Sequence, residues 1–319
     1  MTTLADLAEL VRAPAALSVP GDVVAGAAAA GALSPRTPAL AGASVLLYWA
    51  GMAANDWSDR RLDAVERPER PIPSGRVTPT AALGIAAGLT AAGVGLAAAV
   101  GGRRAAALAV PLAASIWGYD LLAKNTAAGP AVMAACRGLD VLLGASGGRL
   151  ARALPSAVTV AAHTWTVTAL SRREVSGADA VLPMRTLAGT AVVAASAAIA
   201  VPGARRAAAT DTRRAADVEA GPTDERAAVG GGRAWATGIA AALPAVLAGW
   251  YAARYGAAQV QVVRDPSAGK VRAAVGAGIT GLPALQGALT ARGGAGLLGL
   301  AVAAAAPLGR RLARKVSPT

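Results

Sequence analysis

An acidic cluster lies where one long apolar stretch of the chain ends. Asn55, Asp56, Asp59 and Asp63 follow a run rich in alanine, glycine, leucine and valine. On a helix, positions three, four and seven residues apart share one face, so the three aspartates are expected to point the same way. Carboxylates so close together repel one another unless a cation lies among them, and hard oxygen ligands suit Mg²⁺ that bridges to a phosphate. The spacing therefore predicts a magnesium site whose ligands include all four residues.

Two aromatic residues lie about two helical turns before this cluster. Trp49 comes seven residues before Asp56, and Tyr48 comes seven before Asn55. Because a helix rises about 1.5 Å per residue, their rings are expected roughly 10 Å deeper along the same face. A metal site above an apolar cleft lined by rings is suited to a lipid with a diphosphate head.

A second polar group contains a base. Trp117, Asp120 and Lys124 are spaced i, i+3 and i+7, and Tyr119 lies beside them. Lys124 is the only lysine between Met1 and Gly269, where all other basic residues apart from His163 are arginines. A compact ammonium group at this position is suited to a phosphate oxygen.

Ionisable residues also occur within and after the later apolar runs. Arg137 and Asp140 stand three residues apart inside CRGLDVLLG, which predicts an ion pair. Such groups are costly within a membrane span and usually face the interior of the bundle or a water-filled cavity. The next run ends in SRREVSGAD, whose charged residues are Arg172, Arg173, Glu174 and Asp179.

The composition predicts that membrane-spanning helices position these groups. Hydrophobic residues make up 55% of the 319 residues and charged residues 15%, whereas a soluble domain is about 25% charged. Runs that approach about 20 residues can cross a bilayer as helices. The expected spans are Pro14–Leu33, Pro38–Trp57, Pro79–Val100, Arg104–Leu122, Gly129–Ser146, Pro155–Ser171, Met184–Val201 and Ala234–Tyr255, with two weaker runs, Val271–Thr290 and Gly293–Leu308. The predicted fold class is therefore an all-α polytopic membrane protein.

The distribution of the net charge of +13 agrees with the expected membrane topology. Lys and Arg are concentrated in alternate loops, which is the bias of loops on the cytoplasmic side of a membrane. This distribution argues against nucleic acid as a partner, because no single basic face is indicated. We expect the protein in the cytoplasmic membrane, in contact with the lipid bilayer, with the acidic cluster facing the cytoplasm. The sequence predicts a single domain over residues 1–319, with a flexible polar loop at about 203–233.

The stretch NDWSDRRLDAVERPERPIPSG resembles the first aspartate-rich motif of the UbiA superfamily of intramembrane prenyltransferases. The family pattern N-D-x-x-D-x-x-x-D stands here after a second span and is followed by R-P-I-P-S-G, as in several branches. The stretches LVRAPAALSVPGDVVAGA and YWAGMAANDW are also similar to actinobacterial members and to members in ebo-type clusters. The resemblance covers most of the chain. It implies a bundle of nine transmembrane helices around a central cleft, whereas the apolar runs number ten.

The resemblance implies a Mg²⁺-dependent transfer of an isoprenyl group from an isoprenyl diphosphate donor to a small, electron-rich acceptor, for example an aromatic one. It implies catalytic roles for Asp56, Asp59, Asp63, Lys124 and Glu174. The implied metal ligands are Asn55, Asp56, Asp59, Asp63, Glu174 and Asp179. The implied substrate-binding residues are Tyr48, Trp49, Arg67, Arg70, Trp117, Tyr119, Asp120, Arg137, Asp140, Arg172 and Arg173.

The chain departs from the family pattern at two places. The second acidic motif, D-x-x-x-D in the family, is reduced to Glu174 and Asp179, which leaves open whether it binds metal. The Y-x-x-x-K element has an additional residue between Tyr119 and Lys124. Two alternatives therefore remain open. One is a family member that binds an isoprenoid without catalysis, and the other is a cation-coupled transporter whose acids relay protons or Na⁺.

Overall fold

Helices account for the regular structure of the chain in the computed structural model, which describes residues 2–13, 18–179, 181–199 and 241–305. No strand occurs among these residues, so the predicted all-α class is confirmed. The polar loop expected at 203–233 lies outside the described residues, as does the start of the eighth expected span.

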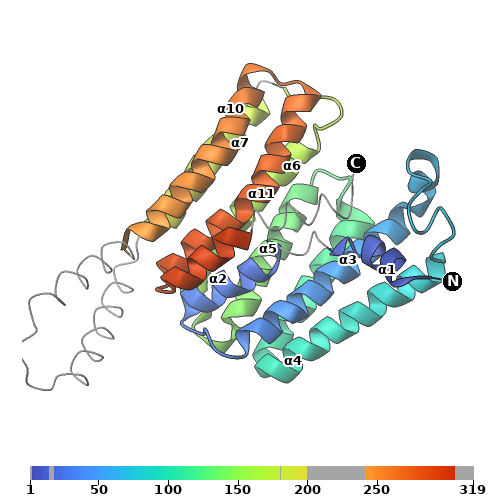
Figure 1. Cartoon of the computed structure of the whole chain (residues 1–319), viewed down its shortest axis with the longest axis horizontal. Helices are drawn as coiled ribbons and strands as arrows, with labels where there is room; N and C mark the ends of the chain where they lie inside the picture. The colour runs from blue at the N-terminus through green and yellow to red at the C-terminus, as the bar shows by residue number, and fades with distance from the viewer. Residues whose placement is uncertain (1, 14–17, 180, 200–240, 306–319) are drawn as a thin grey trace, which may run out of the picture.

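The helices follow one another through short connections (Figure 1). Three of the described helices are long and apolar enough to cross a membrane, namely Thr37–Glu66, Pro79–Ala123 and Val181–Ala198. The described elements are α1 (Leu4–Leu10), α2 (Pro20–Ala30), α3 (Thr37–Glu66), α4 (Pro79–Gly118), a π-helical turn (Tyr119–Ala123), α5 (Gly129–Gly144), a 3₁₀ turn (Ala145–Gly147), α6 (Leu150–Ser171), α7 (Val181–Ala198), a helix over 241–251 that continues through a second π-helical turn (Ala252–Gly256) into α10 (Ala257–Arg264), α11 (Ala268–Arg292) and a short helix (Gly296–Ala305).

α4 contains two of the expected spans rather than one. Gly102 interrupts the helix with a φ of 66°, a left-handed conformation that glycine adopts without the steric cost that other residues incur. The Trp117 indole Nε1 donates to Thr90 Oγ1 at 3.0 Å, so the two halves of α4 run back along each other. The runs expected over 79–100 and 104–122 are thus separate segments joined by a tight turn.

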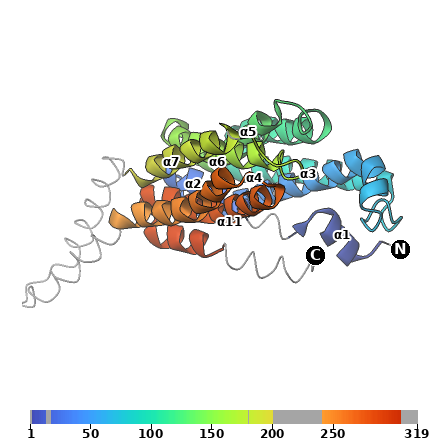
Figure 2. The same ribbon diagram turned by 90° about the horizontal axis from the view of Figure 1, so that it is seen from above.

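α2 lies between α5 and α11 in the middle of the bundle (Figures 1 and 2). It packs against α5 backbone to backbone, because glycine stands at the points of closest approach. A Cβ atom at Gly26 would lie 1.7 Å from the Val141 carbonyl oxygen, and one at Gly144 would lie 2.0 Å from the Val23 carbonyl oxygen. Glycine at such contacts is typical of helices that pack within membranes.

One end of the bundle gathers the loops that follow α3, α4, α6 and α10. Lys124, after α4, contacts Asp59 of α3, and Arg172, after α6, donates to a backbone carbonyl in the loop after α4. The Ala178 N–H donates to the Pro266 carbonyl oxygen at 2.9 Å and joins the last of these loops. The polar groups of the sequence therefore lie at the same end of the molecule.

Candidate active site

The last turns of α3 carry the acidic cluster, and two of its aspartates contact arginines. Asp56 Oδ1 lies 2.7 Å from the Arg12 guanidinium and 3.4 Å from that of Arg70. Arg70 also donates to Asp63 Oδ2 at 2.7 Å, while Arg67 lies 3.9 Å from Asp63. Both carboxylates are buried. Arg70 therefore bridges two acids that stand on one face of α3.

The third aspartate faces a different base. Lys124 Nζ lies 2.6 Å from Asp59 Oδ1 and 3.4 Å from Ser58 Oγ. Beside this pair, Asn55 Nδ2 donates to Asp120 Oδ1 at 3.2 Å. The three aspartates of α3 thus do not meet at one point, because Asp59 is drawn to the loop after α4 while the other two are held by arginines.

The π-helical turn over Tyr119–Ala123 sets the direction of Lys124. The Lys124 N–H donates to the Tyr119 carbonyl oxygen, five residues back, at 2.9 Å. A π turn holds more residues than an α turn, so it accommodates the additional residue between Tyr119 and Lys124. The turn also changes the register of the helix. The prediction that Trp117, Asp120 and Lys124 share one helix face is therefore wrong. Asp120 and Lys124 contact α3, whereas Trp117 packs against the first half of α4.

Two adjoining cavities lie beside the acidic cluster, of which Asn55 alone lines one. The first, which we call the mouth, has a volume of about 240 Å³ and is lined by Arg12, Asn55 and Asp120 among others. The second, which we call the chamber, has a volume of about 320 Å³ and a wall of mainly apolar side chains from α3, α5, α6 and α11. Tyr48 and Tyr119 line both. A polar mouth thus joins an apolar chamber, which suits a molecule with a charged head and a hydrocarbon tail.

The aromatic residues predicted on α3 lie in the chamber wall. The Tyr48 hydroxyl and Trp49 Nε1 are buried without a hydrogen-bond partner among the described residues. The Tyr48 ring also faces Arg137, whose Cζ atom lies 5.4 Å from the ring centre. A buried donor without a partner costs free energy. Both groups are therefore available to an oxygen atom of a bound molecule.

Arg137 belongs to a buried polar network, but its partner is not the one predicted. Its Nε lies 2.7 Å from Asp22 Oδ2 of α2, and Asp22 Oδ1 accepts from Gln286 of α11 at 2.6 Å. Asp140 instead accepts from Ser44 of α3. The expected ion pair between Arg137 and Asp140 is therefore wrong. Asp22, on a helix that faces α5, pairs with Arg137 in place of Asp140.

The loop after α6 does not bring a second acid to the mouth. Asp179 Oδ1 accepts from the N–H groups of Leu182 and Val181 at 2.7 and 2.9 Å, and these hydrogen bonds lower the pKa of Asp179. Partial burial raises the pKa of Glu174, although the Arg272 charge opposes this shift. Asp179 thus caps α7, and neither acid lines the mouth or the chamber. Metal ligation by this pair stays a prediction.

The predicted basic residues differ in how close they lie to the mouth. Arg70 and Lys124 contact the acids of α3 and are mostly buried. Arg67 is more than half exposed at 53%. Arg172 is turned toward the Thr126 carbonyl oxygen, and Arg173 is exposed. Arg70 and Lys124 are therefore the predicted cations best placed to meet a phosphate at the mouth.

The donor chemistry of the mouth fits Mg²⁺. Asn55, Asp56, Asp59 and Asp120 supply hard oxygen atoms in three separate contacts, namely Asn55 with Asp120, Asp56 with Arg12, and Asp59 with Lys124. Across the described part of the chain, no three acidic, histidine or cysteine side chains come close enough to hold an ion by themselves. Mg²⁺ is usually bound by one or two carboxylates together with phosphate oxygens and water. The mouth therefore fits an ion that arrives with a phosphate-bearing ligand.

Sequence reasoning missed three residues of this region, Arg12, Asp22 and Gln286. Arg12 contacts Asp56 and lines the mouth, and it stands in a short amphipathic segment that gave no chemical signal. Asp22 pairs with Arg137 and accepts a hydrogen bond from Gln286, and an acid inside an apolar run was the available signal for Asp22. His163 lines the chamber, and its Nδ1 lies 2.8 Å from the Tyr251 hydroxyl.

The fold and the site define an all-α membrane protein whose apolar chamber has a charged mouth. The sequence model of the UbiA prenyltransferase family matches residues 18–199, and the chain belongs to this family. The match begins just before α2 and ends with α7, so it includes the acidic cluster, the π-helical turn and most of the chamber wall.

Two relatives of the chain are named digeranylgeranylglyceryl phosphate synthase. That of Methanothrix thermoacetophila is 51% identical over 69 residues, which cover 21% of this chain and 25% of the relative. That of Natronomonas pharaonis is 37% identical over 155 residues, which cover 47% and 56%. The chain thus matches about half or less of the length of these relatives. A solved structure of a digeranylgeranylglyceryl phosphate synthase, at 14% identity, covers 90% of this chain and 97% of its own with a TM-score of 0.57, and this likeness concerns the fold alone.

Proposed function

We propose that the protein transfers an isoprenyl group from an isoprenyl diphosphate to a hydroxyl group of a glyceryl phosphate lipid. The observation that carries this proposal is the charged mouth that joins an apolar chamber. The mouth suits the diphosphate, and the chamber suits the hydrocarbon chain. The name of the relatives supports the acceptor, because their product carries two geranylgeranyl groups on a glyceryl phosphate.

In this proposal, the charged residues of the mouth exchange partners when the donor binds. Arg70 and Lys124 contact Asp56, Asp63 and Asp59, so the acids and the bases beside the mouth neutralise one another's charge. Mg²⁺, held by Asp56 and Asp59 with the donor phosphates, would neutralise charge on the leaving diphosphate. Arg70 and Lys124 would then donate charge-assisted hydrogen bonds to the phosphate oxygens.

The chamber would protect the reacting carbon. When the diphosphate leaves with the electron pair of the allylic C–O bond, the carbon becomes cationic, and aromatic ring faces stabilise a nearby cation. Trp49 and Tyr119 are the rings best placed for this, because Tyr48 already faces the Arg137 guanidinium. The apolar wall excludes water that would capture the cation. The acceptor oxygen forms the new C–O bond and gives up its proton to the released diphosphate.

The proposed site of the reaction is the cell membrane, with the mouth on the cytoplasmic side. The apolar helices support a membrane location. The orientation is supported by the Lys and Arg residues in the loops that gather around the mouth, because cytoplasmic loops carry an excess of these residues.

The proposal can be tested with purified protein in liposomes. Labelled geranylgeranyl diphosphate, Mg²⁺ and geranylgeranylglyceryl phosphate should give a product with two prenyl groups, identified by mass spectrometry. EDTA should abolish the reaction, and added Mg²⁺ should restore it. A parallel reaction with 4-hydroxybenzoate tests the aromatic acceptor class, and a product from this acceptor alone would overturn the glyceryl assignment.

The same assay separates the two other classes of protein. Tight binding of the donor without any transfer would identify a non-catalytic isoprenoid carrier. Proton or Na⁺ movement without donor binding would identify a transporter. The position of the cluster favours the enzyme, because its acids lie among bases at a helix end rather than near the middle of a span, where coupling acids usually lie.

A further inference from the structure

The R-P-I-P-S-G stretch at residues 70–75 forms part of a loop that holds helix α1. Leu10, the last residue of α1, is fully buried. It belongs to an apolar cluster with Ile72 and Val77 of this loop and with Ala53 and Ala54 of α3. A fully buried leucine contributes about 1.5–3 kcal/mol. The motif thus has a packing role toward the N-terminal segment in addition to any contact with the donor.

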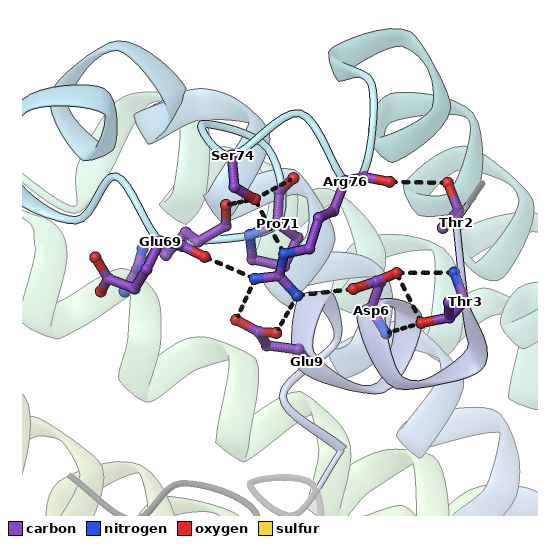
Figure 3. Close-up of polar contacts among 9 residues, drawn as sticks. Thr2, Thr3, Asp6, Glu9, Glu69, Pro71, Ser74 and Arg76 are labelled. Carbon is purple, nitrogen blue, oxygen red and sulfur yellow. Dashed lines mark hydrogen bonds and ion pairs between the residues drawn. The ribbon is translucent and has the colours of Figure 1, made fainter.

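Arg76 directly after this motif fastens the polar side of α1 (Figure 3). Its Nε donates to Ser74 Oγ at 3.0 Å, and one terminal nitrogen donates to Asp6 and to Glu9, each at 2.7 Å. The other terminal nitrogen donates to Glu9 at 3.1 Å and to the Glu69 carbonyl oxygen at 2.6 Å. A guanidinium has five N–H groups, and all five are used here.

The start of α1 is fixed to the same point. Thr2 Oγ1 donates to the Arg76 carbonyl oxygen at 3.0 Å. Thr3 and Asp6 form a capping box, in which the Thr3 N–H donates to Asp6 at 2.8 Å and the Asp6 N–H donates to the Thr3 hydroxyl at 3.2 Å. Asp6 therefore both begins the helix and binds Arg76, so that α1 cannot shift along the loop without losing both contacts.

Docking of α1 determines where Arg12 lies. Arg12 follows the last turn of α1 with a φ of 45°, and it is the one non-glycine residue with positive φ in the described part of the chain. This conformation is unfavourable for residues with a Cβ atom and is typically retained at functional sites. From this position Arg12 reaches across to Asp56 at 2.7 Å and lines the mouth. A strained backbone thus directs a cation onto the acidic cluster.

We propose that α1 is an element of the active site and that Arg76 is its positioning residue, holding α1 so that Arg12 stays at the mouth, beside Asp56. If α1 is released, the mouth loses one positive charge next to Asp56, which retains only the longer contact to Arg70 at 3.4 Å. A more negative mouth binds a diphosphate less well. The effect on catalysis rests on the proposed prenyl transfer, whereas the docking of α1 does not.

Docking is tested by hydrogen exchange in the full-length protein. The amides of residues 4–10 should exchange at least about tenfold faster in Arg76→Gln than in the unmodified chain, because the contacts to two acids weaken. Glu69→Ala is the matched control, since Arg76 binds only the backbone carbonyl of Glu69, and exchange should be unchanged. Arg76→Lys keeps the charge with fewer hydrogen-bond donors, so its amide exchange rate should lie between those of Arg76→Gln and the unmodified chain. Equal exchange in Arg76→Gln and the unmodified chain would overturn the docking role.

The active-site role is tested by kinetics on the same proteins. Arg76→Gln should raise the KM for the isoprenyl diphosphate about tenfold and change kcat by less than about twofold. Arg12→Gln should give a similar rise, and the double variant should show no additional rise, because both act through one contact. Fast exchange with an unchanged KM would show that α1 is merely structural and would overturn the proposal. If the unmodified protein transfers no prenyl group, the proposed function fails while the exchange result still decides the docking.

Discussion

The acids near the mouth are not equivalent at the level of single residues. Asp59 and Asp120 lie beside Lys124 and Asn55, at the mouth. Neither Asp59 nor Asp63 lines a cavity, but the Asp59 side chain is 25% exposed beside Lys124, whereas Asp63 is buried against Arg70. Asp59 and Asp120 are therefore placed to act on the donor phosphates and their metal ion, whereas Asp63 is placed to orient the Arg70 guanidinium.

This difference predicts two kinetic signatures. Asp59→Asn should lower kcat for prenyl transfer by at least about 100-fold, because charge stabilisation of a leaving group is usually worth that much. Asp63→Asn should mainly raise the donor KM, because it releases Arg70 and leaves the metal-facing acids in place. Steady-state kinetics at several Mg²⁺ concentrations measure both. An equal loss of kcat in the two variants would show that Asp63 acts on the reacting centre after all.

The sequence predicted the residues of the mouth better than their partners. The spacing of Asn55, Asp56 and Asp59 predicted a phosphate and metal site; in the structure Asp56 and Asp59 have basic neighbours, whereas Asn55 contacts Asp120. It could not indicate that Arg12 reaches Asp56 from 44 residues away. Nor could it indicate Asp22 as the partner of Arg137. Local spacing determines which residues share a face of a helix, but not which helix faces them.

At the level of elements, two departures from regular helix shape the site. The turn at Gly102 lets α4 fold back, so that its second half delivers Asp120 to α3. The π-helical turn after α4 then directs Lys124 to Asp59. The glycines between the third and fourth apolar runs made the first departure predictable. The second was not, because a π turn depends on the contacts of its side chains with α3.

The turn at Gly102 predicts a stability effect. Nothing lies within 4 Å of a Cβ atom built at Gly102, so Gly102→Ala adds no clash and acts only through its φ of 66°. Alanine in this region should lower the free energy of unfolding by about 1–2 kcal/mol. Gly95→Ala, also in open space but within regular helix, should be neutral or stabilising. Thermal unfolding in detergent compares them, and equal melting temperatures would contradict the conformational argument.

The docking of α1 predicts a pH dependence. Hydrogen bonds from Thr3, and then the bond and charge of Arg76, lower the pKa of Asp6 from 3.8 to about 2. A lowered folded-state pKa means that the stabilisation is present above about pH 4 and is lost as the pH falls toward 2. Exchange of the amides of residues 4–10, corrected for intrinsic rates, should accelerate over that range. In Asp6→Asn it should be fast already at pH 6, and slow exchange in that variant would exclude the Asp6 contact as a cause.

At the level of the whole molecule, one buried network connects the helices around the chamber. Asp22 on α2 contacts both Arg137 on α5 and Gln286 on α11. Asp140 of α5 joins α3 through Ser44. The helical class of the apolar segments was readable from the sequence, but this arrangement was not, because Ala- and Gly-rich helices present similar apolar faces on every side. The few buried charges therefore help to specify which helices pack together.

This network predicts strong coupling between Asp22 and Arg137. Asp22→Asn keeps the shape of the side chain but leaves the buried Arg137 guanidinium without its carboxylate, which should destabilise the protein by about 3–5 kcal/mol. Arg137→Met leaves Asp22 unpaired and should be similarly damaging. The double variant has no buried charge at this pair and should recover much of the loss. Unfolding by denaturant in detergent micelles measures all three proteins. Additive losses in the double variant would show that Asp22 and Arg137 do not depend on each other, and that other contacts of α2 hold the chamber together.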